Sequence, residues 1–507
     1  MKTKRLLTAL LFVGGVISAS ASDYYVSPAG SGDKTGADAA NAWDVETLMD
    51  KFSSDNTATF ENGDNIYFAG GKYVATKTLY VKMGLNLIGA AEGERTLFSG
   101  DANGDGEVNE GDRDRVFQIN TAVGVGTTEK CVSISNIDFD GLFIAQGGND
   151  TKGALYLDNC GALVTVSNCH FTRLINSGQG ANALFSKRSS VKFVDCTFTD
   201  NKAANRGIVA RLQGDTKKGY TTFERCLFAN NEATGAEGDP CGMVMMQHGQ
   251  EMTFNNCVFR DNHCNGNGAA IWNATAPDGT YPRRLILNNT LIYNNTSADG
   301  NAITLHANSN KEYNNSCIEY ANDPRITISS VGYGTYYLGC SYVMPDGVTG
   351  QTISTAADGR LSIGTTYNPG DEVPTGTALL VSGAAGQYEP ALATVTGEAP
   401  ANLLKGSDVA ETTTGGDKYY KLANDPVDGL GFYWAEDGGA AFTNGAHKAY
   451  LTLTGAQARF FSLDFDSETT GISTATTKAI RQGKFVENGF IVIVRNGIKY
   501  NAQGIKL

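Results

Sequence analysis

Short apolar runs that alternate with polar residues recur along the first two thirds of the chain, between turns rich in Gly and Asn. One position shared by six of these runs recurs roughly every 30 residues, at 136, 168, 195, 225, 256 and 289. The six runs are VSISNIDFDG (132–141), VTVSNCHFTR (164–173), VKFVDCTFTDN (191–201), TTFERCLFANN (221–231), MTFNNCVFRDN (252–262) and LILNNTLIYNN (285–295). Another apolar run, often opened by Gly, lies between successive copies. The alternation predicts short β-strands and no amphipathic helix.

The phase of the alternation changes inside each repeat. Val191 and Phe193 share one parity, whereas Cys196 and Phe198 share the other. Because strand side chains alternate with a period of two, the chain must bend between the two pairs. Asn tolerates the left-handed conformation that such a corner needs. Repeated strand–corner–strand units stacked at about 4.8 Å predict a right-handed parallel β-helix over residues 23–322.

Two further patterns resemble known β-helix families. The repeats of FxxN type, followed by a Gly-Ala-Ile-like strand at 268–271, resemble the polymorphic outer-membrane-protein family; they are Phe198–Asn201, Phe228–Asn231 and Phe259–Asn262. YYVSPAGSGDKTG at the N-terminus and NGDNIYFAGGKY (62–73) resemble the opening coils of secreted pectate-lyase-like β-helices. Together these resemblances cover roughly residues 23–320. They imply a β-helix of a superfamily that commonly carries polysaccharide lyases and hydrolases.

The remaining chain has a different pattern. Alternating strands with Gly, Asn and Asp turns predict a small antiparallel β-sandwich over residues 323–472. Phrases such as GFYWAEDGG (431–439) resemble a C-terminal β-module found on many secreted and surface proteins of gut and oral anaerobes. In residues 473–507, two short strands flank Asn496-Gly497 and predict a hairpin. This last segment also resembles sorting signals of type IX secretion, and both interpretations stay open.

The N-terminus predicts export. Residues 1–22 combine the positive charges of Lys2, Lys4 and Arg5 with an apolar stretch and small residues before a cleavage site after Ala21. The stretch is shorter than the ~20 residues of a membrane span, and no other segment of the mature chain approaches that length. We therefore expect a secreted protein, or one at the cell surface or outer membrane of a Gram-negative bacterium. The formal net charge of -13 argues against nucleic acid as a partner.

Four of the ten cysteines occupy the same position in successive repeats. Cys169, Cys196, Cys226 and Cys257 share the parity of the repeated Phe residues and are expected to face inward. Cys is among the residue types most often buried, so we predict a column of thiols, with occasional disulfides between neighbouring coils. No Cys-x-x-Cys with matching His spacing supports a zinc site.

The motif DANGDGEVNEGD (101–112) has the spacing of a twelve-residue calcium loop. It resembles dockerin and EF-hand loops, although strands rather than helices are predicted on both sides of it. An acidic surface turn is the alternative interpretation. The predicted Ca²⁺ ligands are Asp101, Asn103, Asp105, the Glu107 carbonyl, Asn109 and Asp112.

Catalysis on a sugar needs positioned acid and base groups, usually carboxylates. Even offsets from the Gly that opens each second strand should face outward, and these positions contain no Asp or Glu. They are Val209, Arg211, Gln213, Val244, Met246, His248, Ala270, Trp272, Thr304 and His306. We therefore predict no catalytic residues. Four of these positions instead suggest a glycan-binding strip, because an exposed Trp beside cationic side chains suits sugars; they are Arg211, His248, Trp272 and His306.

The expected protein is a non-catalytic β-helix for adhesion or glycan binding. Its partner would be a polysaccharide or a glycan of a host or cell surface. A carbohydrate-active enzyme, either a polysaccharide lyase or a glycoside hydrolase, is the first alternative. A structural cell-envelope protein is the second. The sequence does not indicate the ligand or the oligomeric state, because fold does not determine function.

Overall fold

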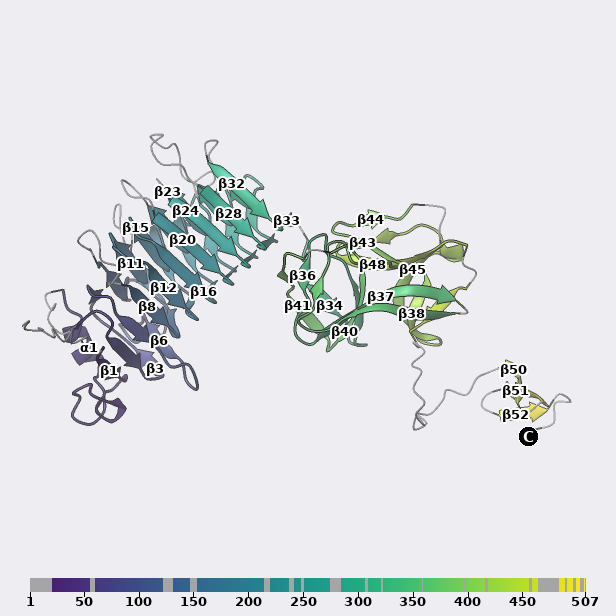
Figure 1. Ribbon diagram of the computed structural model, residues 1–507, viewed down its shortest axis with the longest axis horizontal. Helices are drawn as coiled ribbons and strands as arrows, with labels where there is room; N and C mark the ends of the chain where they lie inside the picture. Colours follow the sequence, from purple (N-terminus) through teal and green to yellow (C-terminus); the bar gives the residue numbers. More distant parts are fainter. Residues whose placement is uncertain are drawn as a thin grey trace, which may run out of the picture. The chain divides into compact units, whose positions relative to one another are not determined.

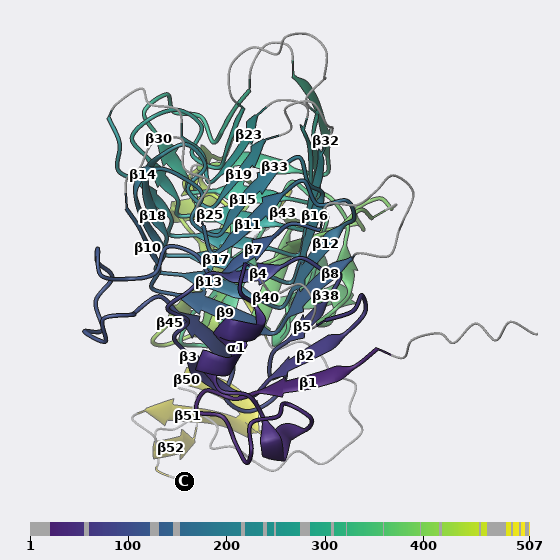
Figure 2. The ribbon, with the colours of Figure 1, turned by 90° about the vertical axis from the view of Figure 1, so that its left-hand side faces the viewer.

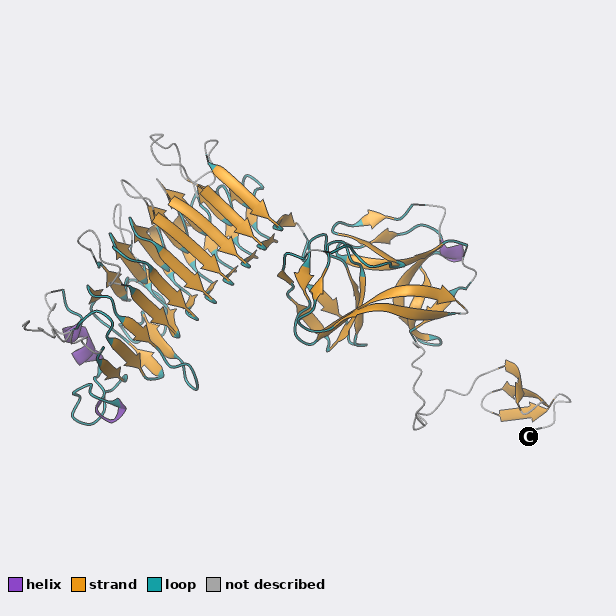
Figure 3. Cartoon of the chain, viewed as in Figure 1, coloured by secondary structure: helices purple, strands orange, loops and turns teal. Residues whose placement is uncertain are grey.

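The structure is a computed structural model of the 507-residue chain. It describes residues 21–54, 60–121, 131–145, 153–213, 219–236, 241–247, 250–273, 284–305, 309–320, 322–357, 359–395, 397–414, 418–455, 458–463, 483–487, 490–495, 498–501 and 506. The predicted signal peptide lies almost entirely outside these residues. Figure 3 shows that strands make up nearly all of the regular structure. Within the described residues, no helix has the length and apolar character needed to cross a membrane.

The chain from Asp23 to Tyr320 forms a parallel β-helix with four sheets, which we call faces 1 to 4 (Figure 1). Face 1 contains β1 (Asp23–Val26), β2 (Asn65–Phe68), β5 (Asn86–Ile88), β8 (Val132–Ser135), β12 (Val164–Ser167), β16 (Val191–Val194), β20 (Gly219–Glu224), β24 (Gln250–Asn255), β28 (Arg284–Asn288) and β32 (Asn310–Asn314). Face 2 contains β3 (Gly71–Tyr73), β6 (Thr96–Ser99), β9 (Ile137–Asp140), β13 (His170–Thr172), β17 (Thr197–Thr199), β21 (Leu227–Ala229), β25 (Val258–Arg260), β29 (Leu291–Tyr293) and β33 (Cys317–Tyr320).

The two other sheets complete each coil. Face 3 contains β10 (Phe143–Ile144), β14 (Ile175–Gln179), β18 (Lys202–Asn205), β22 (Glu232–Ala233), β26 (His263–Cys264) and β30 (Thr296–Ser297). Face 4 contains β4 (Leu79–Val81), β7 (Phe117–Ile119), β11 (Leu155–Asp158), β15 (Leu184–Lys187), β19 (Ala210–Gln213), β23 (Val244–Gln247), β27 (Ile271–Asn273) and β31 (Ile303–Thr304). Helix α1 (Val45–Lys51) lies at the N-terminal end of the coil, as Figure 2 shows, after a 3-10 turn, η1 (Ala39–Asn41).

The corners between faces 1 and 2 have the conformation that the sequence predicts. All six repeated corner positions have φ between 47° and 58°, in the left-handed region. Neighbouring corners are also joined, since Asn168 Nδ2 donates to Asn136 Oδ1 at 2.7 Å and Arg225 Nε donates to Asp195 Oδ1 at 2.7 Å. The corner residue thus bends the chain and holds successive coils together.

The predicted inward column of Cys and Phe is confirmed. Cys169, Cys196, Cys226 and Cys257 are buried free thiols. Beside them the Phe rings of consecutive coils stack, with centroids 4.8 Å apart for Phe198–Phe228 and 4.2 Å apart for Phe228–Phe259. Burial of such a side chain contributes about 1.5–3 kcal/mol, so the repeated column is a main source of stability.

The Asn of each FxxN repeat has a structural role that the motif alone does not reveal. Asn231 is buried, and its Nδ2 donates to the Phe198 carbonyl and to Asn262 Oδ1, both at 2.9 Å. Its own Oδ1 accepts from Asn201 Nδ2 at 2.9 Å. Asn262 donates in turn to Asn295 Oδ1 at 2.8 Å. These residues form a buried Asn ladder that satisfies the polar groups at the second corner of each coil.

Two disulfides are present among the described residues. Cys241–Cys264 joins the start of one face 4 segment to β26 of the following coil. Cys317–Cys340 joins the last strand of face 2 to the module that follows the coil.

Residues 326–462 form the predicted antiparallel module, whose strands build a nearly closed barrel or sandwich. Its nine-stranded sheet contains β35 (Tyr333–Tyr336), β40 (Leu379–Gly383), β37 (Val348–Ala357), β38 (Arg360–Tyr367), β49 (Phe460–Ser462), β46 (Gly429–Trp434), β45 (Lys418–Asp425), β48 (Lys448–Leu453) and β43 (Leu404–Ser407). The smaller elements are β34 (Ile326–Ile328), β36 (Tyr342–Val343), β39 (Glu372–Val373), β41 (Gly386–Tyr388), β42 (Ala391–Leu392), β44 (Glu411–Thr412), β47 (Thr443–Asn444) and the turn η2 (Asp437–Gly439).

The final segment, 464–507, is a separate unit. It contains the predicted hairpin as β51 (Phe490–Arg495) and β52 (Ile498–Asn501), which pair antiparallel. A third strand, β50 (Gly483–Glu487), pairs with β51. Asn496 and Gly497, at the turn, lie outside the described residues.

Candidate glycan-binding faces and a calcium-type loop

Arg211 and Trp272 occupy one outward column of face 4, as the sequence predicts. Arg211 pairs with Met245 on the next coil, and Met245 pairs with Trp272 on the coil after that. The residue between them is Met245 rather than Met246, because Gly207 and Gly242 are not equivalent. Ala210 pairs with Val244, so the count from Gly242 is shifted by one residue.

The outward assignment is therefore wrong for several positions. Val244 and Met246 are 0% exposed and belong to the coil interior, as do Val209 and Ala270. For Val244 and Met246 the cause is the shifted Gly, because pairing within the strand sets the side chain's direction. Val209 and Ala270 precede β19 and β27, so the alternation of the strand does not yet apply to them. His248 and His306 lie outside the described residues.

Other residues shield Arg211 from solvent, which the sequence did not indicate. Its side chain points away from the coil interior, yet the residue is only 6% exposed. The guanidinium lies over the Phe185 ring, 5.4 Å from its centroid, and Nε donates to Gln247 Oε1 at 2.9 Å. Burial, together with the nearby charge of Arg206, lowers the pKa of Arg211. Only Trp272, which is half-buried, presents much of its surface from this part of the predicted strip.

The segment before β19 accounts for part of the burial of this outward column. Gly207 has φ of +76°, and a Cβ at that position would lie 2.8 Å from the Met245 Cβ. The chain before the strand therefore lies directly on the outward column of the next coil. Tyr156 and Phe185 form a small apolar cluster with Ala181 in the same column. Face 4 thus has a second packed layer rather than an open strip.

Face 1 presents a different surface. Two columns of its outward side chains are half-buried or exposed along the length of the sheet, and most of these residues are Asn, Ser or Thr. One column contains Asn65, Asn86, Ser133, Thr165, Lys192, Thr222, Thr253, Ile286 and Glu312. The other contains Tyr67, Ile88, Ser135, Ser167, Val194, Glu224, Asn255, Asn288 and Asn314.

Hydrogen bonds between coils fix many of these side chains. Asn288 Nδ2 donates to Asn255 Oδ1 at 2.7 Å, and Asn314 Nδ2 donates to Asn288 Oδ1 at 2.8 Å. At the other end, Ser133 Oγ donates to Asn86 Oδ1 at 2.7 Å. Each amide uses only part of its hydrogen-bonding capacity in this way, so donors and acceptors remain for a ligand.

The carboxylates in these two columns are held in ion pairs. Glu224 accepts from Lys192 Nζ at 2.7 Å and also pairs with Arg225, and these partners lower the pKa of Glu224. Glu312 pairs with Arg284 at 2.6 Å, which lowers the pKa of Glu312. A general acid must carry a proton near neutral pH, and these groups are held in the ionised form.

Sequence reasoning missed a cluster of charges on face 2. Asp138 and Asp140 both point outward from β9. Arg95 donates to both oxygens of Asp138 at 2.7 Å, and His170 Nδ1 lies 3.5 Å from Asp138. Arg173 Nε donates to Asp140 at 2.7 Å. The alternation in IDFD gives their shared direction, but the Arg partners come from other coils and only the structure brings them together.

Two carboxylates on one face are the groups that a glycoside hydrolase uses. Here each carboxylate is bound by a guanidinium through charge-assisted hydrogen bonds. The cluster is therefore suited to joining neighbouring coils through ion pairs.

The calcium-type loop follows β6 and brings several predicted ligands together. Asp105 Oδ2 accepts from Asn109 Nδ2 at 2.6 Å and from Asn103 Nδ2 at 2.9 Å. Gly106 has φ of +79°, which gives the sharp turn expected at the sixth position. Asp112 Oδ2 accepts from the Asn109 backbone N–H at 2.9 Å, whereas its Oδ1 is buried with no hydrogen-bond partner.

The remaining ligand positions show a different arrangement. Asp101 pairs with Lys72 at 2.8 Å, and this contact lowers the pKa of Asp101. The Glu107 backbone N–H donates to Asp105 Oδ1 at 2.8 Å. Across the described part of the chain, no three side chains of His, Cys, Asp or Glu gather as a metal site would require. The oxygen-rich loop therefore has the turn and an orphaned carboxylate oxygen that suit Ca²⁺, while the Asn103 and Asn109 side-chain amides donate hydrogen bonds to Asp105.

Comparisons with known proteins give only distant likenesses. No protein-family model matches the chain, and no curated protein matches it. Among solved structures, a rhamnogalacturonan lyase has a TM-score of 0.24 at 11% identity, covering 62% of this chain and 92% of its own. ORF18 of Geobacillus virus E2 has a TM-score of 0.25 at 14% identity, covering 96% and 86%. WceF of Pantoea stewartii, described as a glycan biofilm modifying enzyme with a tailspike-like parallel β-helix fold, has a TM-score of 0.21 at 12% identity, covering 91% and 66%.

Proposed function

We propose that the protein is an exported β-helix that binds a glycan along face 1 without transforming it. The observation that carries this proposal is the pair of open columns of hydroxyl and amide groups on that face. The signal peptide predicted at the N-terminus supports a location outside the cell.

The spacing of the columns suits a chain-like ligand. Successive coils repeat at about 4.8 Å, so a sugar polymer running along the coil would meet similar groups at each step. Thr222, Thr253 and Asn255 can each donate and accept hydrogen bonds, as sugar hydroxyls can. The bonds that join Asn255, Asn288 and Asn314 fix these side chains before a ligand arrives, which reduces the entropy lost on binding.

The binding role is preferred over catalysis because of the ion pairs described above. On face 1 the carboxylates in the two columns are paired with Lys or Arg, and on face 2 Asp138 and Asp140 are each bound by an Arg. Acid–base chemistry on a glycosidic bond would first need one of these pairs to separate.

The direct test is binding of the mature protein to a panel of polysaccharides, followed by a double variant of face 1. Thr253→Leu with Asn255→Leu removes two polar groups and changes only outward-facing positions of β24. Loss of two neutral hydrogen-bonding groups should weaken binding by about fivefold to a hundredfold. The matched control is Thr197→Leu with Thr199→Leu, which makes a similar change at outward positions of β17 on face 2.

The same panel tests the enzyme alternative. We expect no release of reducing ends or unsaturated products. Turnover that disappears in Asp138→Asn would instead identify the face 2 cluster as catalytic. Equal loss of binding in the face 1 variant and its control would contradict the proposed binding face.

We also propose that the loop 101–112 binds one Ca²⁺. Asp105 and Asp112 would supply carboxylate oxygens, and the Asn103 and Asn109 side chains would turn their Oδ1 atoms toward the ion. The orphaned Oδ1 of Asp112 supports this proposal, because a buried carboxylate oxygen without a partner is unfavourable. The bound ion would make this loop rigid where it projects from the coil.

A further inference from the structure

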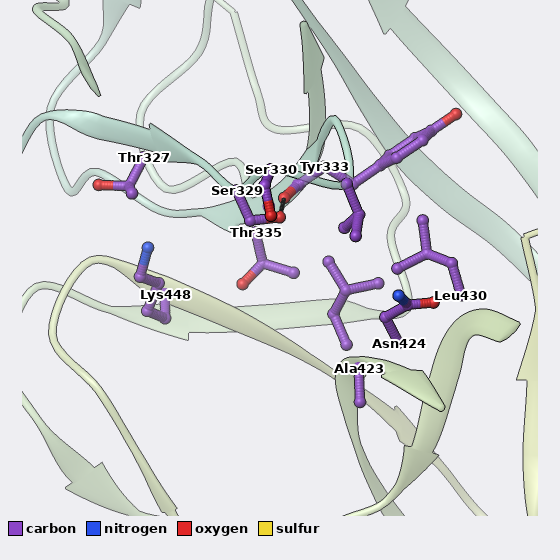
Figure 4. A pocket seen from close by; sticks show the side chains of 12 residues that line it. Thr327, Ser329, Ser330, Tyr333, Thr335, Ala423, Asn424, Leu430 and Lys448 are labelled. Carbon is purple, nitrogen blue, oxygen red and sulfur yellow. Dashed lines mark hydrogen bonds between the residues drawn. The ribbon is translucent and has the colours of Figure 1, made fainter. Parts of the chain in front are cut away.

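The module contains a pocket that the proposed function does not use. Its volume is about 420 Å³, within the range of about 300–1,000 Å³ that is common for small-molecule sites. Strands β34 and β35 form one side of it, while β45, β46 and the start of β48 form the other (Figure 4).

The pocket arises where the barrel does not close completely. Strands β35 and β48 approach each other, but they are not neighbours in the sheet. Two hydrogen bonds connect them instead: Thr335 Oγ1 accepts from the Ala449 backbone N–H at 3.1 Å, and just outside the strands the Tyr337 backbone N–H donates to the His447 carbonyl at 3.2 Å. Because the two strands are not paired, space remains between them, and residues of both line the pocket.

Lys448 provides a positive charge in this gap. Figure 4 shows its side chain directed from β48 toward Thr327, into the space between the two walls. Burial lowers the pKa of Lys448. Within the described part of the module, no carboxylate forms an ion pair with its ammonium group. Asp323 has a longer-range electrostatic interaction with Lys448, but its carboxylate is already paired with Arg325 at 2.5 Å.

The lining combines two kinds of side chain. Hydroxyl and amide groups come mainly from the side of β34 and β35, and apolar side chains come mainly from β45 and β46. The polar group contains Thr327, Ser329, Ser330, Thr335 and Asn424, and the apolar group contains Val331, Leu422, Ala423 and Leu430. A pyranose ring has hydroxyl groups on its rim and apolar C–H groups on its faces, so both kinds of side chain have a counterpart in one sugar.

We propose that this pocket binds an acidic monosaccharide unit, a uronate, with its carboxylate on Lys448. The ring hydroxyls would meet the Thr, Ser and Asn side chains, and a C–H face would lie against Leu430 and Ala423. A neutral sugar would leave the ammonium group without a partner, so the pocket should prefer the acid. This site does not depend on glycan binding by face 1.

Calorimetry on the mature full chain tests the proposal with glucuronate and galacturonate, and with glucose and galactose as their neutral counterparts. Lys448→Met should weaken uronate binding by about tenfold to a hundredfold, because a charged hydrogen bond is lost. Lys405→Met is the matched control, since Lys405 is an exposed lysine on β43 of the same module. It should leave the affinity unchanged, and Lys448→Arg should retain most of it.

The pH dependence gives a second readout. The ammonium form binds the carboxylate, and its pKa lies below the usual 10.5. Affinity should therefore fall as pH rises through this lowered pKa, and the fall should be absent in Lys448→Met. The sugar's own carboxylate is ionised throughout that alkaline range.

Three results would overturn the proposal. They are equal binding of uronates and neutral sugars, equal binding of inorganic phosphate or acetate and the uronates, and unchanged uronate affinity in Lys448→Met with the melting temperature preserved. If Lys448→Met does not fold, the comparison of Lys448→Arg with the wild type across pH replaces it. Polysaccharide binding that survives in Lys448→Met but fails in the face 1 variant separates the two sites.

Discussion

The coil and the module are both built from β-strands, but they obtain their stability in different ways. In the coil, a residue packs against the equivalent residue of the next coil, as Phe198 does against Phe228 with ring centroids 4.8 Å apart. In the module, Tyr336 packs edge-on against Tyr342 and Tyr420 against Phe461, and neither contact is repeated. When the same structural environment recurs in every coil, the same residue type recurs in the sequence. An environment that occurs once leaves no such pattern. The coil's interior can therefore be read from the sequence, and the module's closure cannot.

The largest expected effect tests the inward column. Cys226→Arg places a charge among buried Phe rings with no partner, and an uncompensated buried charge costs about 3–5 kcal/mol. Thr222→Arg, on the outward side of β20, should change stability little. The midpoint of urea unfolding measures both. If the two variants unfold at the same urea concentration, the inward column does not stabilise the coil as argued.

A smaller effect distinguishes a ladder from a single hydrogen bond. Asn231→Ala removes the bonds that Asn231 Nδ2 donates to the Phe198 carbonyl and to Asn262, and those that its Oδ1 accepts from Asn201, so we expect a loss of about 3 kcal/mol. Asn444→Ala in the module removes a single side-chain hydrogen bond, the one that Asn444 donates to the Lys448 carbonyl. The expected loss in the free energy of unfolding is about 1 kcal/mol. Thermal and urea unfolding of the two variants give the comparison. Equal losses would show that the ladder adds nothing beyond one bond.

The calcium-type loop is the part of the coil that, like the module, has no repeat to support it. If it binds Ca²⁺, an excess of a hundred times the Kd should stabilise the folded protein by about 2.7 kcal/mol. Calorimetry should then detect one site, and Asp105→Ala should abolish both the heat and the stabilisation. Asp346→Ala, at an exposed turn of the module, is the control that should keep them. Identical heats with Asp105→Ala and the wild type would exclude this loop as the site.

Local sequence determined the elements that depend only on neighbouring residues and on repetition. Change of parity placed the corner between Phe193 and Cys196, and the left-handed φ of Asp195 follows from that bend. The shared parity of Cys196 and Phe198 placed both in the interior. These predictions succeeded because a strand's alternation and a corner's backbone are local properties.

Tertiary structure decided everything that depends on pairing across coils or on closure of a sheet. The register of Ala210 with Val244 turned Met245 outward, and the chain at Gly207 covered the column that contains Arg211. The ion pairs of Asp138 and Asp140 join coils that are remote in sequence. Lys448 faces a pocket only because β35 and β48 approach without pairing. The residues next to each member of such a pair do not indicate which residue it will contact. The distance between the two members depends on the path of the whole chain.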